Sequence, residues 1–118
     1  MSHTQTRRCE FDKRTRLKII ERDRGCIFCQ ANYHMEDTDS FGRECFEIMH
    51  YVARSHGGLG IEQNGAIGCK SHHAMLDNGN KGRREEMLAI FRDHLKRFYK
   101  DWNEAALVYS KWKSISNP

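Results

Sequence analysis

Cysteine and histidine residues fall in two short pairs that have the spacing of metal ligands. Two residues separate Cys26 from Cys29, and two residues separate Cys69 from His72. Zinc takes four Cys or His ligands in a tetrahedron, commonly from two such pairs. The sequence therefore predicts a structural Zn²⁺ on these four residues, which would act as a staple for a short chain with a small core.

Three further residues bear on this predicted zinc site. His34 is an alternative to His72 as the fourth ligand. Cys9 and Cys45 belong to no pair of this spacing, so we interpret them as free thiols. The odd total of five cysteines, together with a polar and basic segment 1–8 in place of a secretion signal, favours a reducing, cytoplasmic location.

A second set of residues suits hydrolysis of a phosphodiester bond. That reaction needs a base that deprotonates water and a cation that neutralises the charge building on the phosphate. His50 suits the base because histidine titrates near neutral pH. His73 and Asp77 are four residues apart, so on a helix they face the same way and can bind a divalent cation. Asn64 could orient the imidazole of His50 or reach the metal through its side-chain carbonyl.

These residues must be positioned by short elements. We expect a strand over 45–52, a glycine-rich loop over 54–63, a returning strand over 64–69 and a helix over 71–77. Alternation along the first strand places Phe46, Ile48 and His50 on one face and Glu47, Met49 and Tyr51 on the other.

The flanking segments are expected to be mostly helical. Residues 12–24 are predicted to form a helix that Asp12 caps and Gly25 ends, with Leu17 and Ile20 on its apolar face. A tight turn over 25–29 and an irregular loop over 30–44 follow. Two C-terminal helices are predicted within 83–113, the first over 83–100 and the second over 101–113. The apolar stripe of the first consists of Met87, Leu88, Phe91, Leu95, Phe98 and Tyr99. Residues 1–10 are predicted to be a flexible arm, and the whole of 1–118 a single domain with its core at about 25–80.

Charge is concentrated at the N-terminal end of this sequence. Of its 118 residues, the first 24 hold eight Lys or Arg and four acidic residues, which accounts for the whole formal net charge of +4. Such a segment suits a polyanionic partner. Lys13, Arg14, Lys18 and Arg22 are the candidates for phosphate contacts, and a solvated helix face is the alternative interpretation of these charges. No apolar run is long enough for a membrane span, so a soluble protein without a membrane partner is expected.

In order and spacing, these motifs resemble those of the HNH endonuclease family. His50-Tyr-Val-Ala-Arg-Ser-His-Gly-Gly58 is similar to the first His and the loop of that family, Leu59-Gly-Ile-Glu-Gln-Asn64 to its Asn, and Cys69-Lys-Ser-His72-His73 to its last element. The resemblance covers roughly residues 12–80 and is strongest over 45–79. The segment after Tyr99 resembles the tail of small phage or prophage members, which implies a bacterial or phage-infected cell.

The resemblance implies an α+β fold with a ββα-metal nuclease core, a zinc-knuckle staple, an N-terminal basic helix and C-terminal helices. It implies a metal-dependent DNA endonuclease or nickase that leaves a 5′-phosphate and a 3′-hydroxyl. His50 would be the general base, Asn64 would fix the geometry, and His73 would bind the catalytic cation, with Asp77 as a further ligand. Arg54 would face the phosphates of the DNA.

Three positions depart from the family pattern. Met49 stands where many members have a metal-binding Asp, and a thioether is a poor ligand for Mg²⁺, so Mn²⁺ or Ni²⁺ could replace it. Ala53 replaces a frequent Pro, and His72 replaces a zinc cysteine. A site weakened at Met49 leaves an alternative function, a non-catalytic zinc-stapled module that binds DNA or protein. No element that reads bases is evident, so a protein partner could supply specificity.

Overall fold

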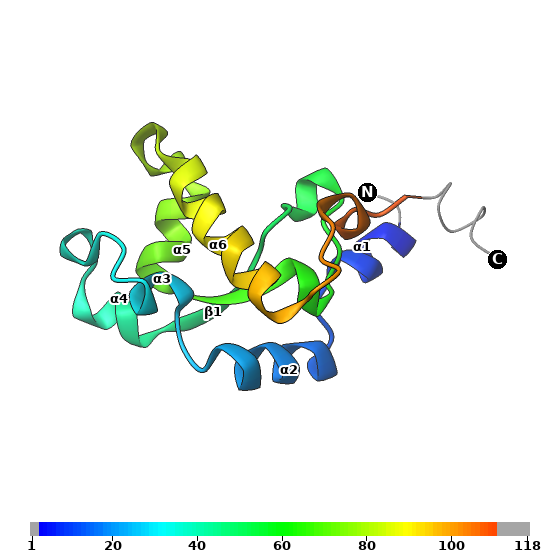
Figure 1. Ribbon diagram of the computed structural model, residues 1–118, viewed down its shortest axis with the longest axis horizontal. Coiled ribbons are helices and arrows are strands. Elements are labelled where there is room, and N and C mark those ends of the chain that lie inside the picture. The colour runs from blue at the N-terminus through cyan, green and yellow to red at the C-terminus, as the bar shows by residue number, and fades with distance from the viewer. Residues whose placement is uncertain (1–2, 111–118) are drawn as a thin grey trace.

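The computed structural model describes residues 3–110 and places a two-stranded antiparallel sheet between helices (Figure 1). The strands are β1 (Phe46–His50) and β2 (Gly65–Cys69). The helices are α1 (His3–Cys9), α2 (Lys13–Asp23), α3 (Ile27–Gln30), α4 (Ser40–Glu44), α5 (Lys70–Asp77) and α6 (Arg84–Phe98). Short 3₁₀ turns are η1 (Met35–Asp37), η2 (Arg54–His56), η3 (Glu62–Asn64), η4 (Gly79–Gly82) and η5 (Glu104–Leu107). Helix α2 lies on one side of the sheet, and α5 and α6 lie on the other.

The two strands form where they were predicted, and their register sets the position of the site. His50, the last residue of β1, lies opposite Gly65, the first residue of β2. A Cβ atom on Gly65 would lie 2.6 Å from the ring of Phe11, so a glycine is needed where this ring packs on the sheet. On the other face, Met49 is fully buried and Tyr51 contacts Phe91 of α6 with 5.4 Å between ring centroids.

Helix α2 begins and ends close to the predicted residues. The Asp12 side chain accepts a hydrogen bond from the Thr15 backbone N–H, as expected of an N-cap. The helix ends at Arg24, whose φ of 62° lies in the left-handed region, rather than at the expected Gly25. Its buried apolar residue is Ile19, whereas Leu17 and Ile20 are 56% and 48% exposed. The expectation that Leu17 and Ile20 form the packed face of this helix was therefore wrong.

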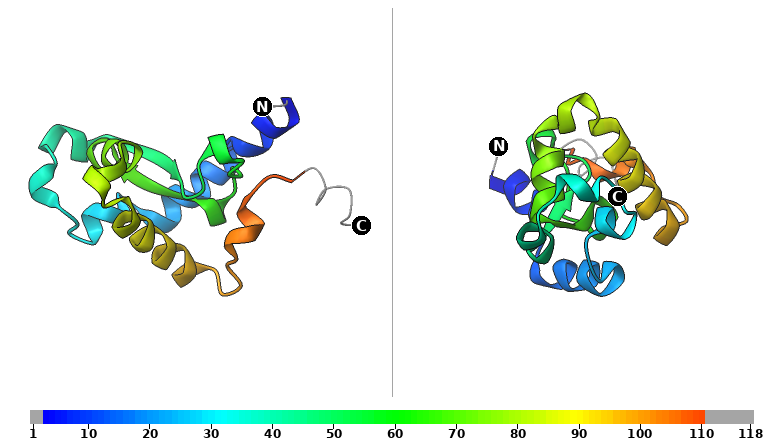
Figure 2. Two further views of the ribbon diagram at one scale, coloured as in Figure 1. Left: turned by 90° about the horizontal axis from the view of Figure 1, so that it is seen from above. Right: turned by 90° about the vertical axis from the view of Figure 1, so that its left-hand side faces the viewer.

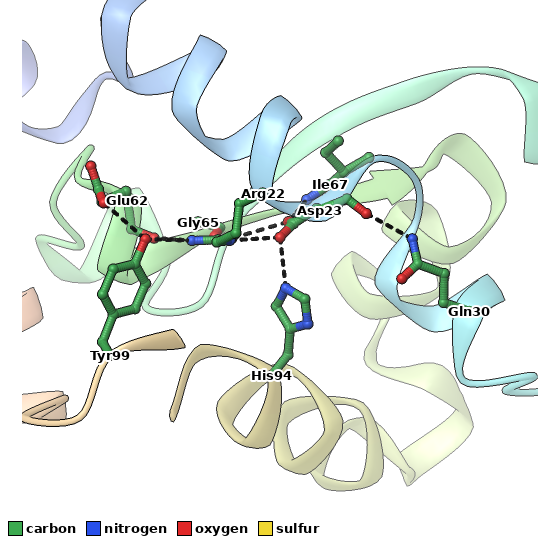
Figure 3. Close-up of polar contacts among 8 residues, drawn as sticks. All are labelled: Arg22, Asp23, Gln30, Glu62, Gly65, Ile67, His94 and Tyr99. Carbon is green, nitrogen blue, oxygen red and sulfur yellow. Dashed lines mark hydrogen bonds and ion pairs between the residues drawn. The ribbon is translucent and has the colours of Figure 1, made fainter. Parts of the chain in front are cut away.

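A buried polar network explains why α2 turns Ile19, and not Leu17 or Ile20, toward the interior (Figure 3). The carboxylate of Asp23 bonds with Arg22 at 2.6 Å and with Nε2 of His94 at 2.7 Å, and it accepts from the Ile67 N–H at 2.9 Å. Arg22 also donates to the carbonyl oxygen of Gly65 at 2.6 Å. Because these contacts reach β2 and α6, they turn Arg22 and Asp23 inward and leave Leu17 and Ile20 on the outside.

Two segments expected to be irregular contain helices. Instead of a flexible arm over 1–10, α1 spans His3–Cys9, and the Arg8 carbonyl oxygen accepts from the Gly60 N–H at 2.8 Å. Residues 1–2 lie outside the described residues. The predicted loop over 30–44 includes η1 and α4, and Gly42 of α4 packs so closely on Ser71 of α5 that a side chain would clash there.

The C-terminal part follows the prediction only through α6. Met87, Phe91 and Leu95 are fully buried, as the stripe predicted, but Phe98 is 45% exposed. No second α-helix forms over 101–110. The chain makes η5 there and then a single bridge between Val108 and Gly58. The last residues of the predicted helix, 111–113, lie outside the described part. Among the described residues, no helix is long and apolar enough to cross a membrane.

Candidate functional site

Four side chains from three elements converge on one point that could hold a metal ion. Cys26 caps α3 and Cys29 lies within it, while Cys69 caps α5 and His72 lies in its first turn. The Cys29 and Cys69 sulfurs are 3.8 Å apart, and His72 Nδ1 lies 3.6 Å from each sulfur of the Cys26–Cys29 pair. Tetrahedral zinc with bonds of about 2.3 Å to sulfur and about 2.0–2.1 Å to nitrogen has edges of roughly 3.8 and 3.5 Å. The geometry therefore fits a structural metal such as zinc.

The backbone around these four residues is arranged to hold them in place. The N–H of Cys29 donates to the sulfur of Cys26, and the N–H of His72 donates to that of Cys69, each at 3.4 Å. Nε2 of His72 bonds to the carbonyl oxygen of Tyr33 at 2.7 Å, which directs Nδ1 to the metal position. His34, the alternative fourth ligand, lies instead beside the carboxylates of Glu36 and Asp37.

The electrostatics of the cluster shows what a bound cation would change. Burial and the neighbouring thiols raise the pKa of Cys29 to about 12, and burial raises the pKa of Cys26. Thiolates bind metal, and a bound divalent cation offsets the cost of placing them together. Cys9 and Cys45 are free thiols outside the cluster.

A cavity of about 640 Å³ collects most of the predicted catalytic residues. His50 enters it from β1, His73 and Asp77 from α5, and Arg54 from the loop after β1. The four positions that the sequence pattern predicted thus lie around one hollow. We call it the catalytic cavity, a name that refers only to the role that the sequence analysis predicts for these residues. It is also lined by residues that the sequence reasoning missed, among them Glu10, Phe11, Arg16 and Arg84. These four come from flanking segments to which no motif points.

The imidazole of His50 is held in one tautomer. Its Nε2 lies 2.7 Å from the carbonyl oxygen of Cys9. A carbonyl oxygen can only accept, so Nε2 carries the proton and Nδ1 keeps its lone pair. The Phe11 ring packs on the imidazole with 4.3 Å between centroids. Burial lowers the pKa of His50 below its ordinary 6.5 against the Cys9 hydrogen bond, and the positive charges of Arg54 and His73 also lower it. A neutral imidazole with a free lone pair can act as a base near pH 7.

Asn64 does not contact His50, although the sequence suggested that it could. Its amide is fully buried, accepts from the Val52 N–H at 2.8 Å, and donates to the carbonyl oxygens of Val52 and Leu59 at 3.1 and 2.8 Å. The two bonds to Val52 join the ends of the glycine-rich loop, and the bond to Leu59 ties the middle of the loop to Asn64. Asn64 is therefore a positioning residue, and its amide is already occupied by the backbone.

His73 lies between two carboxylates. Its Nδ1 is 2.8 Å from Glu47 Oε1, and its Nε2 is 3.5 Å from Asp77 Oδ2. Glu47 was not predicted as a site residue. Met49 packs in the core with no exposed surface, and its sulfur fills the space over Gly68. The side chain at position 49 therefore has no access to the cavity, and Glu47 is the β1 carboxylate nearest to His73.

The predicted phosphate contacts separate into exposed and interior residues. Lys13 and Arg14 are exposed. Lys18 pairs with Glu62 at 3.4 Å, and Arg54 pairs with Glu10 at 3.4 Å. Arg22 has only 9% of its side chain exposed and belongs to the buried network of Figure 3, which removes it as a phosphate contact.

No model of a known protein family matches this chain, and no curated protein or solved structure is significantly similar to it.

Proposed function

We propose that this protein is a metal-dependent DNA endonuclease or nickase with a ββα-metal core made of β1, β2 and α5. The observation that carries the proposal is the catalytic cavity. In it a histidine in a base-ready tautomer, His50, shares one hollow with a histidine–carboxylate pair, His73 and Asp77, and with arginines. These are the groups that phosphodiester hydrolysis requires.

The chain's own residues divide the proposed reaction between them. Nδ1 of His50 takes a proton from a water molecule, and the resulting hydroxide attacks the phosphorus atom. The bond from phosphorus to the 3′ oxygen breaks, and the departing oxygen takes a proton from a second water molecule, which leaves a 5′-phosphate and a 3′-hydroxyl. Arg54, Arg16 and Arg84 line the same cavity and would offset charge on the phosphate. The carbonyl oxygen of Cys9 holds His50 and stabilises the imidazolium that forms.

His73 and Asp77 would hold a catalytic divalent cation, with Glu47 beside them. Such an ion would supply positive charge to the phosphate and the leaving oxygen. Mg²⁺ is commonly bound by one or two carboxylates together with water and substrate phosphate, and an imidazole in the set suits Mn²⁺ or Ni²⁺ better. In this account Zn²⁺ on Cys26, Cys29, Cys69 and His72 is structural and holds α3 against α5.

One observation favours the alternative, a zinc-stapled module that binds DNA or protein without cutting. Both ring nitrogens of His73 already face carboxylates. Within residues 3–110, the groups whose ligand atoms lie mutually close are the Cys₃His cluster and the His34–Glu36–Asp37 group, and neither lies in the catalytic cavity. The proposed cation site therefore depends on water or substrate for completion.

A supercoiled-plasmid assay tests the proposal. Protein that retains its structural zinc is freed of other divalent ions, and Mg²⁺, Mn²⁺, Ni²⁺ or Zn²⁺ is added back separately to wild type and His50→Ala. We expect nicked or linear DNA from wild type with at least one ion, and loss of turnover in the variant. Intact zinc and DNA binding without cleavage by any ion would favour the binding module.

A further inference from the structure

A second hollow, of about 250 Å³, lies beside the catalytic cavity between α2 and β1. It is lined by Arg16, Ile20, Arg24, Phe46, Glu47, Ile48 and Ile67. We call it the β1 recess. Arg16 and Ile48 line both hollows, so the two adjoin along β1. The β1 recess is therefore next to the cavity that contains His50.

The β1 recess has an apolar floor and a basic rim. Two of its large apolar side chains are well exposed, Phe46 at 58% and Ile20 at 48%. Two exposed arginines, Arg16 on α2 and Arg24 directly after it, line the recess, and Glu47 is the one acidic residue in its lining. An anionic ligand that carries a flat apolar ring complements this combination of surfaces.

The direction of β1 relates the recess to the reacting group. Phe46 and His50 lie on the same face of β1 because side chains alternate along a strand. With a rise of about 3.3 Å per residue, these residues are about 13 Å apart along the strand. A short stretch of extended polynucleotide can therefore have a phosphate at His50 and a neighbouring base at Phe46.

We propose, on the basis of the nuclease function above, that the β1 recess binds an unpaired base of the strand that is cut, stacked on the ring of Phe46. In a duplex the base faces are covered by stacking and only their edges are accessible, so an aromatic platform can be used only by a single-stranded or frayed segment. The volume, below the range of about 300–1,000 Å³ usual for ligand pockets, suits one ring system. The protein would thus prefer single-stranded or frayed DNA to an intact duplex.

Binding measurements on non-cleaving protein test this separately from catalysis. In a His50→Ala background, fluorescence anisotropy would follow a labelled oligothymidylate and a matched duplex, with Phe46→Ala and Phe46→Trp compared. Phe41→Ala is the matched control, because Phe41 is 70% exposed on α4 and lies outside the recess. Zinc content and circular dichroism would verify folding of each variant.

We expect tighter binding of the single strand than of the duplex. Phe46→Ala should weaken single-strand binding about five- to a hundredfold, the usual effect of losing one stacking aromatic, whereas Phe46→Trp and Phe41→Ala should bind as the parent does. The proposal is overturned if Phe46→Ala has no effect or weakens both DNAs equally. It is also overturned if light scattering shows a dimer that Phe46→Ala dissociates, because the recess would then bind a second copy. Phe46-dependent single-strand binding by a wild type that never cuts DNA would leave the recess proposal standing and refute the nuclease.

Discussion

Three histidines of the site differ in the atoms that surround them. The imidazole of His50 is hydrogen-bonded to a carbonyl oxygen, and that of His72 faces cysteine sulfurs. The imidazole of His73 lies between two carboxylates. Each partner sets a different property of the ring. The carbonyl oxygen fixes which nitrogen of His50 keeps a lone pair. The carboxylates beside His73 are groups that can help to bind a divalent cation. At the scale of single residues, the role of each histidine follows from its partner atoms rather than from its residue type.

The lowered pKa of His50 predicts how cleavage depends on pH. Only the neutral imidazole can accept a proton, and burial moves the pKa of His50 below 6.5. Activity should therefore be flat through neutral pH and fall with acid only below 6.5. A profile of kcat/KM between about pH 5 and 8 measures this. A limb centred above 6.5 would contradict the assignment.

Arg54 provides an internal check on that profile. Its positive charge contributes to the lowered pKa of His50, so Arg54→Ala should move the acid limb to higher pH. Arg83→Ala is the matched control, because Arg83 is exposed and lies outside the catalytic cavity. Equal shifts in the two variants would indicate a general effect of net charge.

At the scale of elements, the buried network joins α2 to β2 and α6 through Asp23. Asp23→Ala would leave the buried charge of Arg22 without its carboxylate partner, which should lower the free energy of unfolding by about 3–5 kcal/mol. Asp12→Ala removes an exposed cap of the same helix and should cost clearly less. Urea unfolding of both variants measures the difference, and a loss at Asp23 no larger than that at Asp12 would show that the network contributes little.

The same carboxylate should contribute to acid sensitivity. Burial acts to raise the pKa of Asp23, but hydrogen bonds from His94 and Arg22 outweigh it and hold that pKa below its ordinary 3.8. Stability from the ionised group is therefore present above pH 3.8 and is lost as pH falls through the lower folded pKa.

The Cys₃His cluster joins α3 to α5, so metal removal should act on the whole fold. Structural zinc supplies about 10–16 kcal/mol in small metal domains, at least as much as the total stability of about 5–15 kcal/mol of a typical domain. Chelation, or Cys29→Ser, should therefore unfold the chain.

Because the pKa values of Cys26 and Cys29 are raised, zinc affinity should also fall as pH falls. Zinc content and thermal melts measure both effects. Cys45→Ser, which lies outside the cluster, should keep its zinc and its melting temperature.

Elements with a local signal could be predicted from the sequence, and elements set by distant contacts could not. Alternation and spacing located β1, β2, α5 and α6, and the two Cys/His pairs located the metal cluster. The inward rotation of α2 depends on His94, 71 residues away from Asp23, which no local pattern reveals. The Cys9–His50 bond likewise joins positions 41 residues apart, so the part that α1 plays in the site was missed.

At the scale of the molecule, α2 carries basic residues and one of them, Arg16, lines both the catalytic cavity and the β1 recess. DNA binding should therefore weaken with salt. Lys13→Ala and Arg14→Ala should each reduce the slope of log K against log salt concentration by about 1. Lys81→Ala removes the same charge from η4, far from α2 in Figure 2, and should leave the slope unchanged. If all three variants change the slope equally, DNA does not bind specifically at α2.

Chemical rescue of a His50 variant tests whether His50 is the base of a nuclease. His50→Gly, with zinc bound, should cut DNA about a hundred- to ten-thousandfold more slowly than wild type. Added imidazole should restore part of the rate, whereas His56→Gly, which alters an exposed loop histidine outside the cavity, should need no rescue. Cleavage by His50→Gly at the wild-type rate without imidazole would contradict the account.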